Sequence, residues 1–289
     1  MATYSDTPLA REEAVTFHNG SATLAGTLVL PRLKSPCPGV VLIHGSGDDT
    51  RDDYRMFADH FAQHGIACLI YDKRGVGAST GSWRAGTFAE LADDALAGVR
   101  LLAQHAEIDQ QRIGLWGCSE GGWVAPLAAS QSAQVRFVVA VSPPGMSPVA
   151  QEEYRRKLLI MGSSRFRLRR AWRRANIRML FRILRHSPKR LLPGLAGYFA
   201  RTMDFDPLQY WKGVTQPVLL IFGADDKAVP PQQSAAMIEA ALREAGNQDF
   251  TIRIFPNGDH GIQFRNGETK QRMFVPGYLD MVATWIAVR

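Results

Sequence analysis

Short apolar runs alternate along the chain with segments in which apolar residues recur at helical spacing. The runs at 39–44 and 66–71 are almost continuously apolar, which is typical of strands buried on both faces of a sheet. Apolar residues between 54 and 61 follow the period of a helix instead. The same patterns predict strands at 14–18, 22–30, 113–116, 137–141, 218–222 and 250–255, and helices at 88–104, 123–129, 233–245 and 273–288. This alternation predicts a mostly parallel sheet covered by helices.

Composition is compatible with one large α/β domain that carries an insertion. The 289 residues are 46% hydrophobic and 21% charged, which excludes a disordered or collagen-like chain. No apolar run approaches the roughly 20 residues of a membrane-spanning helix, and residues 1–6 lack the pattern of a secretory leader, so a cytoplasmic protein is expected. Cys37, Cys68 and Cys118 are odd in number and widely spaced, which argues against a disulfide framework or a zinc site.

The net charge of +7 is distributed unevenly along the chain. Residues 151–201 hold 15 Lys or Arg and only Glu152 and Glu153 as acids, so this segment carries +13 and the rest of the chain −6. Within it, 165–185 reads as a cationic amphipathic helix. Its predicted apolar stripe is Leu168, Trp172, Ala175, Met179 and Ile183.

The segment Gly117-Cys118-Ser119-Glu120-Gly121 fits the pattern G-x-S-x-G between a predicted strand and a predicted helix. In that context a sharp strand-to-helix turn exposes the serine hydroxyl, and the flanking glycines relieve crowding of the backbone. We therefore predict Ser119 as a nucleophile. Cys118 lies beside the apex of the turn, which makes a cysteine hydrolase an unfavoured alternative.

With this motif, the sequence resembles the α/β-hydrolase family, and within it the esterase-like and serine-aminopeptidase-like branch. The resemblance rests on three ordered motifs: His44-Gly45-Ser46-Gly47, residues 72–79 and the turn at Ser119. It implies an α/β-hydrolase fold with a helical cap inserted after the sixth strand. The expected boundaries are 1–146 and 207–289 for the two parts of the core and 147–206 for the cap.

A serine hydroxyl needs an adjacent base, and the base needs a carboxylate that holds its tautomer. The family order is serine, acid, histidine. Downstream of Ser119 the choice for the histidine lies between His186, inside the arginine-rich segment, and His260 in a glycine-flanked loop, which we favour. For the acid, residues 223–230 resemble the family's G-x-x-D-x-x-V-P, whose register selects Asp226. Asp225 remains its neighbouring competitor, and Asp259 lies too close to His260 in sequence to match the family arrangement.

The resemblance also implies an oxyanion hole built from two backbone N–H groups. One is that of Glu120, which follows the nucleophile, and the other comes from the loop after the third strand at Ser46. The Glu120 carboxylate would be unfavourable beside a developing anion, so it must point away or pair with a cation. Lys73 and Arg74 are the candidates for that cation.

Two clusters of polar residues could be taken for catalytic or metal-binding sites, but a structural role in their loops explains each cluster better. Asp72 and Arg74 sit in a glycine-shaped turn of the kind held by internal polar contacts. The acids at 48–53 could suggest a metal, but Arg51 and Arg55 are interleaved with them, and a self-paired loop is the better interpretation. No metal and no organic cofactor is expected.

We therefore predict a serine hydrolase that cleaves a carboxylic ester of a small-molecule acyl substrate, which the basic cap suggests is anionic. Thioesterase or aminopeptidase-like activity on the same triad is the alternative, because the pocket decides between leaving groups. A non-catalytic protein that binds anionic partners through the cap is the alternative of another class. The arginines of 151–201 fit a solvated or internally paired face, an anionic ligand site, or peripheral contact with a membrane; nucleic acid is a less favoured partner.

Overall fold

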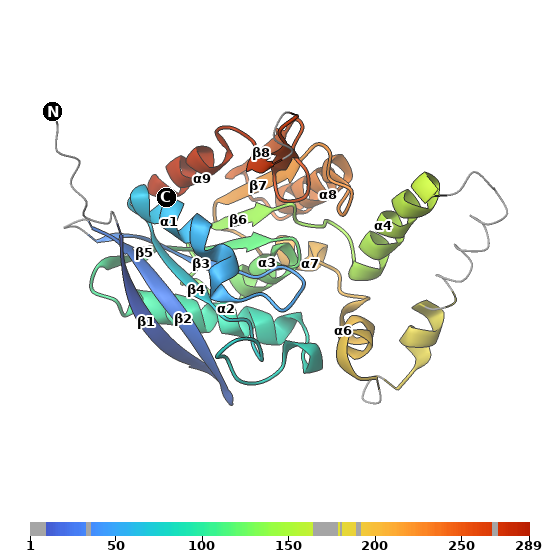
Figure 1. Cartoon of the computed structure of the whole chain (residues 1–289), viewed down its shortest axis with the longest axis horizontal. Helices are drawn as coiled ribbons and strands as arrows, with labels where there is room; N and C mark the ends of the chain where they lie inside the picture. Colours follow the sequence, from blue (N-terminus) through green and yellow to red (C-terminus); the bar gives the residue numbers. More distant parts are fainter. Residues whose placement is uncertain (1–9, 33–35, 164–178, 180, 189–191, 268–270) are drawn as a thin grey trace.

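The structure is a computed structural model that describes residues 10–32, 36–163, 179, 181–188, 192–267 and 271–289 (Figure 1). Most of the chain forms one layered α/β unit. Helices α4 (Pro148–Ser163) and α6 (Gly194–Thr202) lie to one side of this unit. In the sequence, they fall between the sixth and seventh strands. Within the described ranges, no helix combines the length and the apolar character needed to cross a membrane.

The centre of the molecule is an eight-stranded sheet with the order β1-β2-β4-β3-β5-β6-β7-β8. Its strands are β1 (Ala10–Asn19), β2 (Ala22–Pro31), β3 (Cys37–Ile43), β4 (Ala67–Tyr71), β5 (Ile108–Cys118), β6 (Val138–Val141), β7 (Val218–Gly223) and β8 (Phe250–Phe255). Strands β3 to β8 pair in parallel, and β2 pairs antiparallel with both β1 and β4. The strands predicted at 14–18 and 22–30 are present as β1 and β2, and they form a hairpin with Gly20 at φ 58° in the turn.

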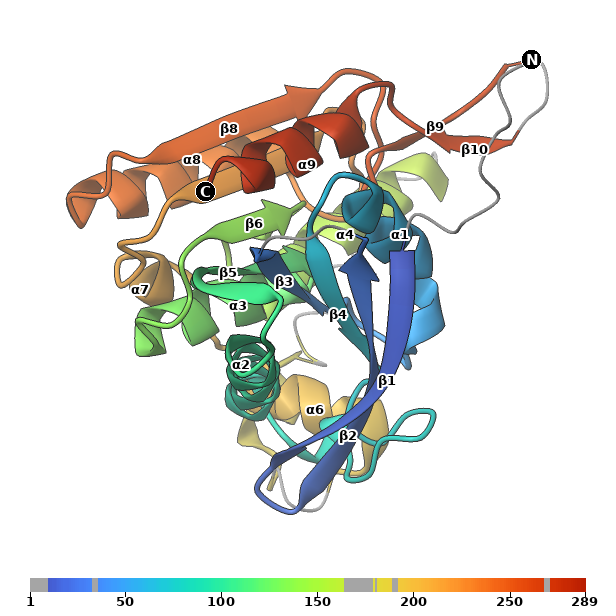
Figure 2. The ribbon, with the colours of Figure 1, turned by 90° about the vertical axis from the view of Figure 1, so that its left-hand side faces the viewer.

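Helices cover both faces of this sheet (Figure 2). On one face, α2 (Phe88–Ala103), α3 (Gly121–Gln131), α7 (Leu208–Trp211) and α8 (Pro231–Glu244) contribute to one apolar cluster. On the other, α1 (Arg55–Gln63) and α9 (Tyr278–Ala287) contribute to a second. The central strands are buried on both sides, so their near-continuous apolar runs are the expected pattern for this arrangement. Short 3₁₀ turns at Arg51–Tyr54 and Trp83–Ala85 complete the loops after β3 and β4.

The prediction of a helix from residue 273 was wrong at its beginning. Residues Arg272–Phe274 form β10, which pairs antiparallel with β9 (Gln263–Arg265), and α9 begins only at Tyr278. The reason is local: Pro276 lacks a backbone donor and disfavours helical geometry at the residue before it, and Gly277 has the left-handed φ of 78°. The spacing of apolar residues alone does not reveal that the helix is interrupted before Tyr278.

Candidate active site

Ser119 lies at the turn between β5 and α3 with φ 55°, a backbone conformation that a residue with a side chain adopts at a cost of about 1–3 kcal/mol. The turn is tight enough to require its glycines. A Cβ on Gly117 would approach the carbonyl oxygen of Gly121 to 2.3 Å, and one on Gly121 would lie 2.8 Å from that of Ile43. The sequence-predicted turn is therefore present, and it leaves Ser119 half-buried at the carboxyl end of the sheet.

His260 and Asp226 are brought together from two different loops. His260 Nδ1 lies 2.8 Å from Asp226 Oδ2, while Asp226 Oδ1 accepts hydrogen bonds from the N–H groups of Ala228 and Val229 at 2.7 and 3.0 Å. The Asp226 side chain is fully buried, whereas Asp225 is exposed. An acceptor on Nδ1 places the imidazole proton there and leaves the lone pair of the neutral ring on Nε2, which is the tautomer a general base needs.

The end of β6 connects the serine turn to the histidine loop. The N–H of Ser119 donates to the carbonyl oxygen of Val141 at 2.9 Å. The next residue, Ser142, donates its hydroxyl to the carbonyl oxygen of His260 at 2.9 Å. The consecutive residues Val141 and Ser142 thus bind both the turn of Ser119 and the loop of His260. Ser142 itself has φ 48°, so this junction carries backbone strain of its own.

Ser46 and Glu120, the predicted oxyanion residues, lie side by side. The Ser46 hydroxyl donates to Glu120 Oε2 at 3.3 Å, and Lys73 Nζ lies 2.7 Å from Glu120 Oε1. Lys73 also donates to the carbonyl oxygen of Gly45 at 2.7 Å, and its side chain is 1% exposed against 3% for Glu120. Of the two cations proposed to neutralise Glu120, the structure thus selects Lys73. Arg74 pairs with Asp94 instead.

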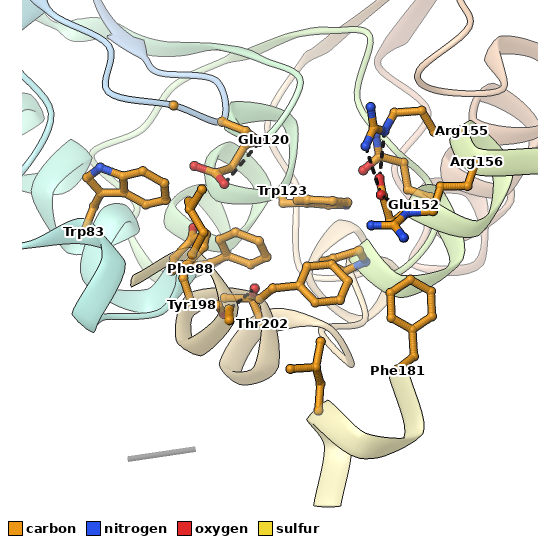
Figure 3. Close-up of a pocket in the computed structure, with 18 residues that line it drawn as sticks. Trp83, Phe88, Glu120, Trp123, Glu152, Arg155, Arg156, Phe181, Tyr198 and Thr202 are labelled. Atoms are coloured by element: carbon orange, nitrogen blue, oxygen red, sulfur yellow. Dashed lines mark hydrogen bonds and ion pairs between the residues drawn. The ribbon is translucent and has the colours of Figure 1, made fainter. Parts of the chain in front are cut away.

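A cavity of about 530 Å³ opens beside these residues, and six of the 18 residues that line it are aromatic. Ser46 and Glu120 line one end of it, and Arg155 and Arg156 line the other, as Figure 3 shows for the labelled side chains. The aromatic side chains between them are Trp83, Phe88, Trp123, Phe181, Tyr198 and Phe199. Burial and the nearby Glu120 carboxylate raise the pKa of the Tyr198 phenol, so this ring is a neutral wall at every ordinary pH.

A second cavity, of about 1430 Å³, lies on the other side of Arg155. Its wall contains His260 and Asp226 together with the charged residues Lys227, Asp259 and Arg265. Helix α4 contributes to the walls of both spaces, since Arg155 lines both. The predicted histidine and acid therefore face one cavity, and the predicted oxyanion residues face the other.

The polar residues interpreted as scaffold do hold loops together. The Asp72 carboxylate binds the Arg51 side chain and backbone and the N–H of Ala78. Burial opposes its ionisation, yet these hydrogen bonds outweigh burial and lower the pKa of Asp72 to about 2. His44 is buried with Nε2 2.6 Å from the carbonyl oxygen of Tyr71, and burial followed by the Lys73 charge lowers the pKa of His44 to about 3. This histidine is therefore a neutral structural donor between the β3 and β4 loops.

Cys118 and the acids at 48–53 also have structural surroundings. Burial and the nearby Asp226 carboxylate raise the pKa of the Cys118 thiol to about 12, so it is not a thiolate nucleophile at neutral pH. Asp48 binds Trp83 Nε1 and pairs with Arg84, and Asp53 accepts hydrogen bonds from Thr50. Asp53 is thus held within its own loop, but Asp48 binds residues of the loop after β4. Arg51 pairs with Asp72 and Arg55 with Glu12, so the prediction that these arginines mainly pair with the acids of their own loop was wrong.

In the described part of the basic insertion, the residues that face the cavity are not those of the predicted apolar stripe. Met179 and Ile183, two members of the expected apolar stripe, are 62% and 52% exposed; Leu168, Trp172 and Ala175 lie outside the described residues. The cavity is lined instead by Phe181 and Leu184. Phe181 packs against Phe199 with ring centroids 5.5 Å apart, a contact with another segment that apolar spacing cannot reveal.

Several charges of the insertion are neutralised within it. Glu152 binds both Arg155 and Arg156, and Arg185 forms an ion pair with Asp204. Ion pairs within the insertion thus involve the positive charges of Arg155, Arg156 and Arg185. Glu152 nevertheless has two guanidinium groups to neutralise, and this leaves one positive charge at the end of the aromatic cavity.

The family model of the alpha/beta hydrolase family matches residues 40–271, which is most of the chain and includes every candidate site residue. The chain belongs to the alpha/beta hydrolase family. This membership also explains the strand order and the position of the serine turn, and it confirms the predicted fold class.

Curated relatives of the chain include proteins named as an esterase and as a thiohydrolase. The chain is 27% identical to Esterase EstD of Thermotoga maritima over 91% of its own length and 65% of that protein. It is 34% identical to Thiohydrolase aneE of Aspergillus aculeatus over 37% of its length and 34% of that protein. The chain thus spans less than two thirds of the length of these relatives.

Solved structures share the fold at low sequence identity. A hypothetical protein from Pseudomonas aeruginosa superposes with a TM-score of 0.67 at 20% identity, covering 98% of this chain and 95% of that one. An esterase from Pyrococcus furiosus superposes with a TM-score of 0.65 at 17% identity, covering 100% of this chain and 93% of that one. These likenesses support the fold alone.

Sequence reasoning missed two contributors to the site. Ser142 anchors the histidine loop, and its only sequence signal is its position directly after a buried strand and before Pro143. Gln151 of α4 donates its side-chain N–H to the carbonyl oxygen of Ala228 at 3.1 Å and so ties the insertion to the loop of Asp226. Neither residue belongs to a motif.

Proposed function

We propose that this alpha/beta hydrolase is a serine hydrolase that cleaves a carboxylic ester through an acyl-enzyme intermediate. The observation that carries the proposal is the convergence at the end of β6. Val141 and Ser142 bind the strained turn of Ser119 and the loop of His260, while His260 is hydrogen-bonded to the buried Asp226. A nucleophile, a base and an orienting acid are the three parts that acyl transfer to a serine requires.

In the proposed reaction, Ser119 Oγ attacks the acyl carbon while His260 Nε2 accepts the hydroxyl proton. Asp226 holds the tautomer and stabilises the imidazolium that forms. The imidazolium then returns this proton to the departing alcohol oxygen as the ester C–O bond breaks. In the second half, His260 deprotonates a water molecule, which attacks the acyl-enzyme and releases the acid and Ser119.

The oxyanion of each tetrahedral intermediate is assigned to the backbone N–H groups of Ser46 and Glu120. Fixed dipoles of this kind stabilise charge that develops in the transition state. The Lys73 ammonium supports the assignment because it neutralises the Glu120 carboxylate, which would otherwise repel the oxyanion. The adjacent aromatic cavity, at about 530 Å³, is assigned to the acyl group, and the cavity that contains His260 is assigned to the leaving group.

Two refinements of the substrate class have specific support. The excess positive charge at Arg155 and Arg156 favours an acyl group that ends in an anion. The similarity to a protein named a thiohydrolase favours thioesters as the alternative substrates of the same triad. Because the mechanism is the same for both leaving atoms, the pocket decides between them.

The test compares Ser119→Ala with Ser130→Ala, a matched serine change on α3 whose hydroxyl donates to the Leu127 carbonyl within the helix. Hydrolysis of p-nitrophenyl esters with acyl chains of increasing length, and of one that ends in a carboxylate, is followed by absorbance. We expect Ser119→Ala to lose at least about 10⁴-fold in kcat. Ser130→Ala should keep wild-type activity, and a folded Ser119→Ala protein that retains turnover would refute the assignment.

A further inference from the structure

Outside the candidate active-site residues, two histidines and an aspartate converge between α1 and α9, on the face of the sheet that these two helices cover. Helices α1 and α9 pack against each other (Figure 1). His60 and His64 are one turn apart at the end of α1, and Asp280 lies in the first turn of α9. One ligand atom of each residue lies within 4.8 Å of the other two.

The distances match the geometry of a tetrahedral metal ion. His60 Nε2 lies 3.3 Å and His64 Nε2 3.7 Å from the same oxygen, Asp280 Oδ1. Two ligands held about 2.0–2.1 Å from a tetrahedral zinc ion are about 3.3–3.4 Å apart. The two observed nitrogen–oxygen separations are within a few tenths of an ångström of this spacing, and the three ligand atoms all lie within 4.8 Å of one another.

A hydrogen bond orients the His64 imidazole as in metal sites. His64 Nδ1 lies 2.8 Å from the carbonyl oxygen of His60, so Nδ1 carries the proton and the Nε2 lone pair faces the carboxylate. This backbone contact is the kind that fixes the tautomer of metal-bound histidines. His60 Nε2 is buried and makes no hydrogen bond to the described residues. The lone pair of His64 Nε2 and the Asp280 carboxylate oxygen that it faces repel each other unless a proton or a metal ion lies between them.

The position of the two histidines at the end of α1 favours a cation. They occupy the negative end of the α1 dipole, where a cation is stabilised. His60 and His64 have ring centroids only 4.4 Å apart, which suits two ligands of one ion.

We propose that His60, His64 and Asp280 bind a divalent transition-metal ion, with Zn²⁺ favoured by two imidazoles and one carboxylate at tetrahedral spacing. Water completes the coordination, because His64 and Asp280 are partly open to solvent at 38% and 69% exposure. The ion links α1 to the last helix of the chain. Its role is to stabilise this face of the sheet, away from Ser119.

The experiment titrates the purified chain, stripped of metal with a chelator, with Zn²⁺ in a calorimeter and with Co²⁺ in a spectrophotometer. Wild type is compared with Asp280→Asn, with His64→Ala and with the control His105→Ala. His105 forms a single histidine–carboxylate contact with Glu13 at the same 3.3 Å separation, and among the residues that the structure describes it belongs to no cluster of three possible metal ligands. Circular dichroism before titration establishes that each variant is folded.

We expect one ion per chain, tetrahedral Co²⁺ absorption bands, and a rise in Tm with Zn²⁺ for wild type and His105→Ala. Both cluster variants should bind Zn²⁺ at least tenfold more weakly and lose the rise in Tm. The proposal is overturned if wild type does not bind Zn²⁺ below about 1 mM, or if both cluster variants bind it as tightly as wild type. Ester hydrolysis is not a readout, so this outcome is independent of the proposed function.

Discussion

The two cavities that share Arg155 differ in their walls, and the difference assigns them different parts of a substrate. The smaller one is walled by aromatic side chains from the core and the insertion and ends at Ser46 and Glu120. The larger one contains His260 and Asp226 among charged residues. An apolar wall binds an acyl chain and a polar wall admits an alcohol and water, so the chemistry is expected where the two meet.

Two adjacent acids of the larger cavity, Asp225 and Asp226, offer the strongest test of this division. Asp226 is buried on His260, whereas Asp225 is exposed in the same loop, so Asp226→Asn and Asp225→Asn are matched changes. We expect Asp226→Asn to reduce kcat by about 10³–10⁴-fold, because the amide no longer enforces the tautomer. Asp225→Asn should change kcat less than twofold. Steady-state kinetics with one ester decides, and equal losses in both variants would contradict the assigned acid.

The buried ion pair at the Glu120 end of the smaller cavity can be tested by measuring the stability of the protein. Lys73–Glu120 and Lys212–Glu244 are ion pairs of the same 2.7 Å length, one buried and one exposed. Lys73→Met leaves a buried carboxylate uncompensated, so we expect a loss of about 3–5 kcal/mol in the free energy of unfolding. Lys212→Met should cost at most about 1 kcal/mol. Urea denaturation measures both. Similar losses would mean that Lys73 does not neutralise Glu120 in the folded protein.

The smallest expected effect concerns which cavity holds the acyl chain. Ala196 lines the aromatic cavity and Ala224 lines the polar one, and both are exposed. Ala196→Trp should lower kcat/KM for an octanoate ester by about 10–200-fold while leaving an acetate ester nearly unchanged. Ala224→Trp should leave the dependence on acyl length unchanged. The assignment is reversed if Ala224→Trp, and not Ala196→Trp, alters that dependence.

Most of the core could be predicted because its signals are local. A continuously apolar strand, a following glycine-bounded turn and a helix can each be recognised from neighbouring residues, as at Ser119. The beginning of α9 was misplaced because apolar residues at 273–275 belong to a β hairpin, and spacing does not distinguish this hairpin from a helical turn. The choice of Asp226 over Asp225 depended on family register, and only burial and contact with His260 distinguish them physically.

The insertion was harder to predict because its contacts are long-range. Helical spacing selected Met179 and Ile183, yet the structure buries Phe181, whose partners Phe199 and Arg156 come from other helices. In the same way, Ser142 matters because β6 ends between two loops far apart in sequence. Such positions follow from the packing of distant segments, which periodicity does not encode.

The central claim is that Ser119 becomes covalently acylated, and labelling tests it most directly. Wild type, Ser119→Ala and Ser130→Ala are treated with a fluorophosphonate, and the modified peptide is identified by mass spectrometry. The account predicts one adduct, on Ser119, in wild type and Ser130→Ala and none in Ser119→Ala. Labelling of folded Ser119→Ala to the same extent as wild type, or an adduct at another residue of wild type, would contradict it.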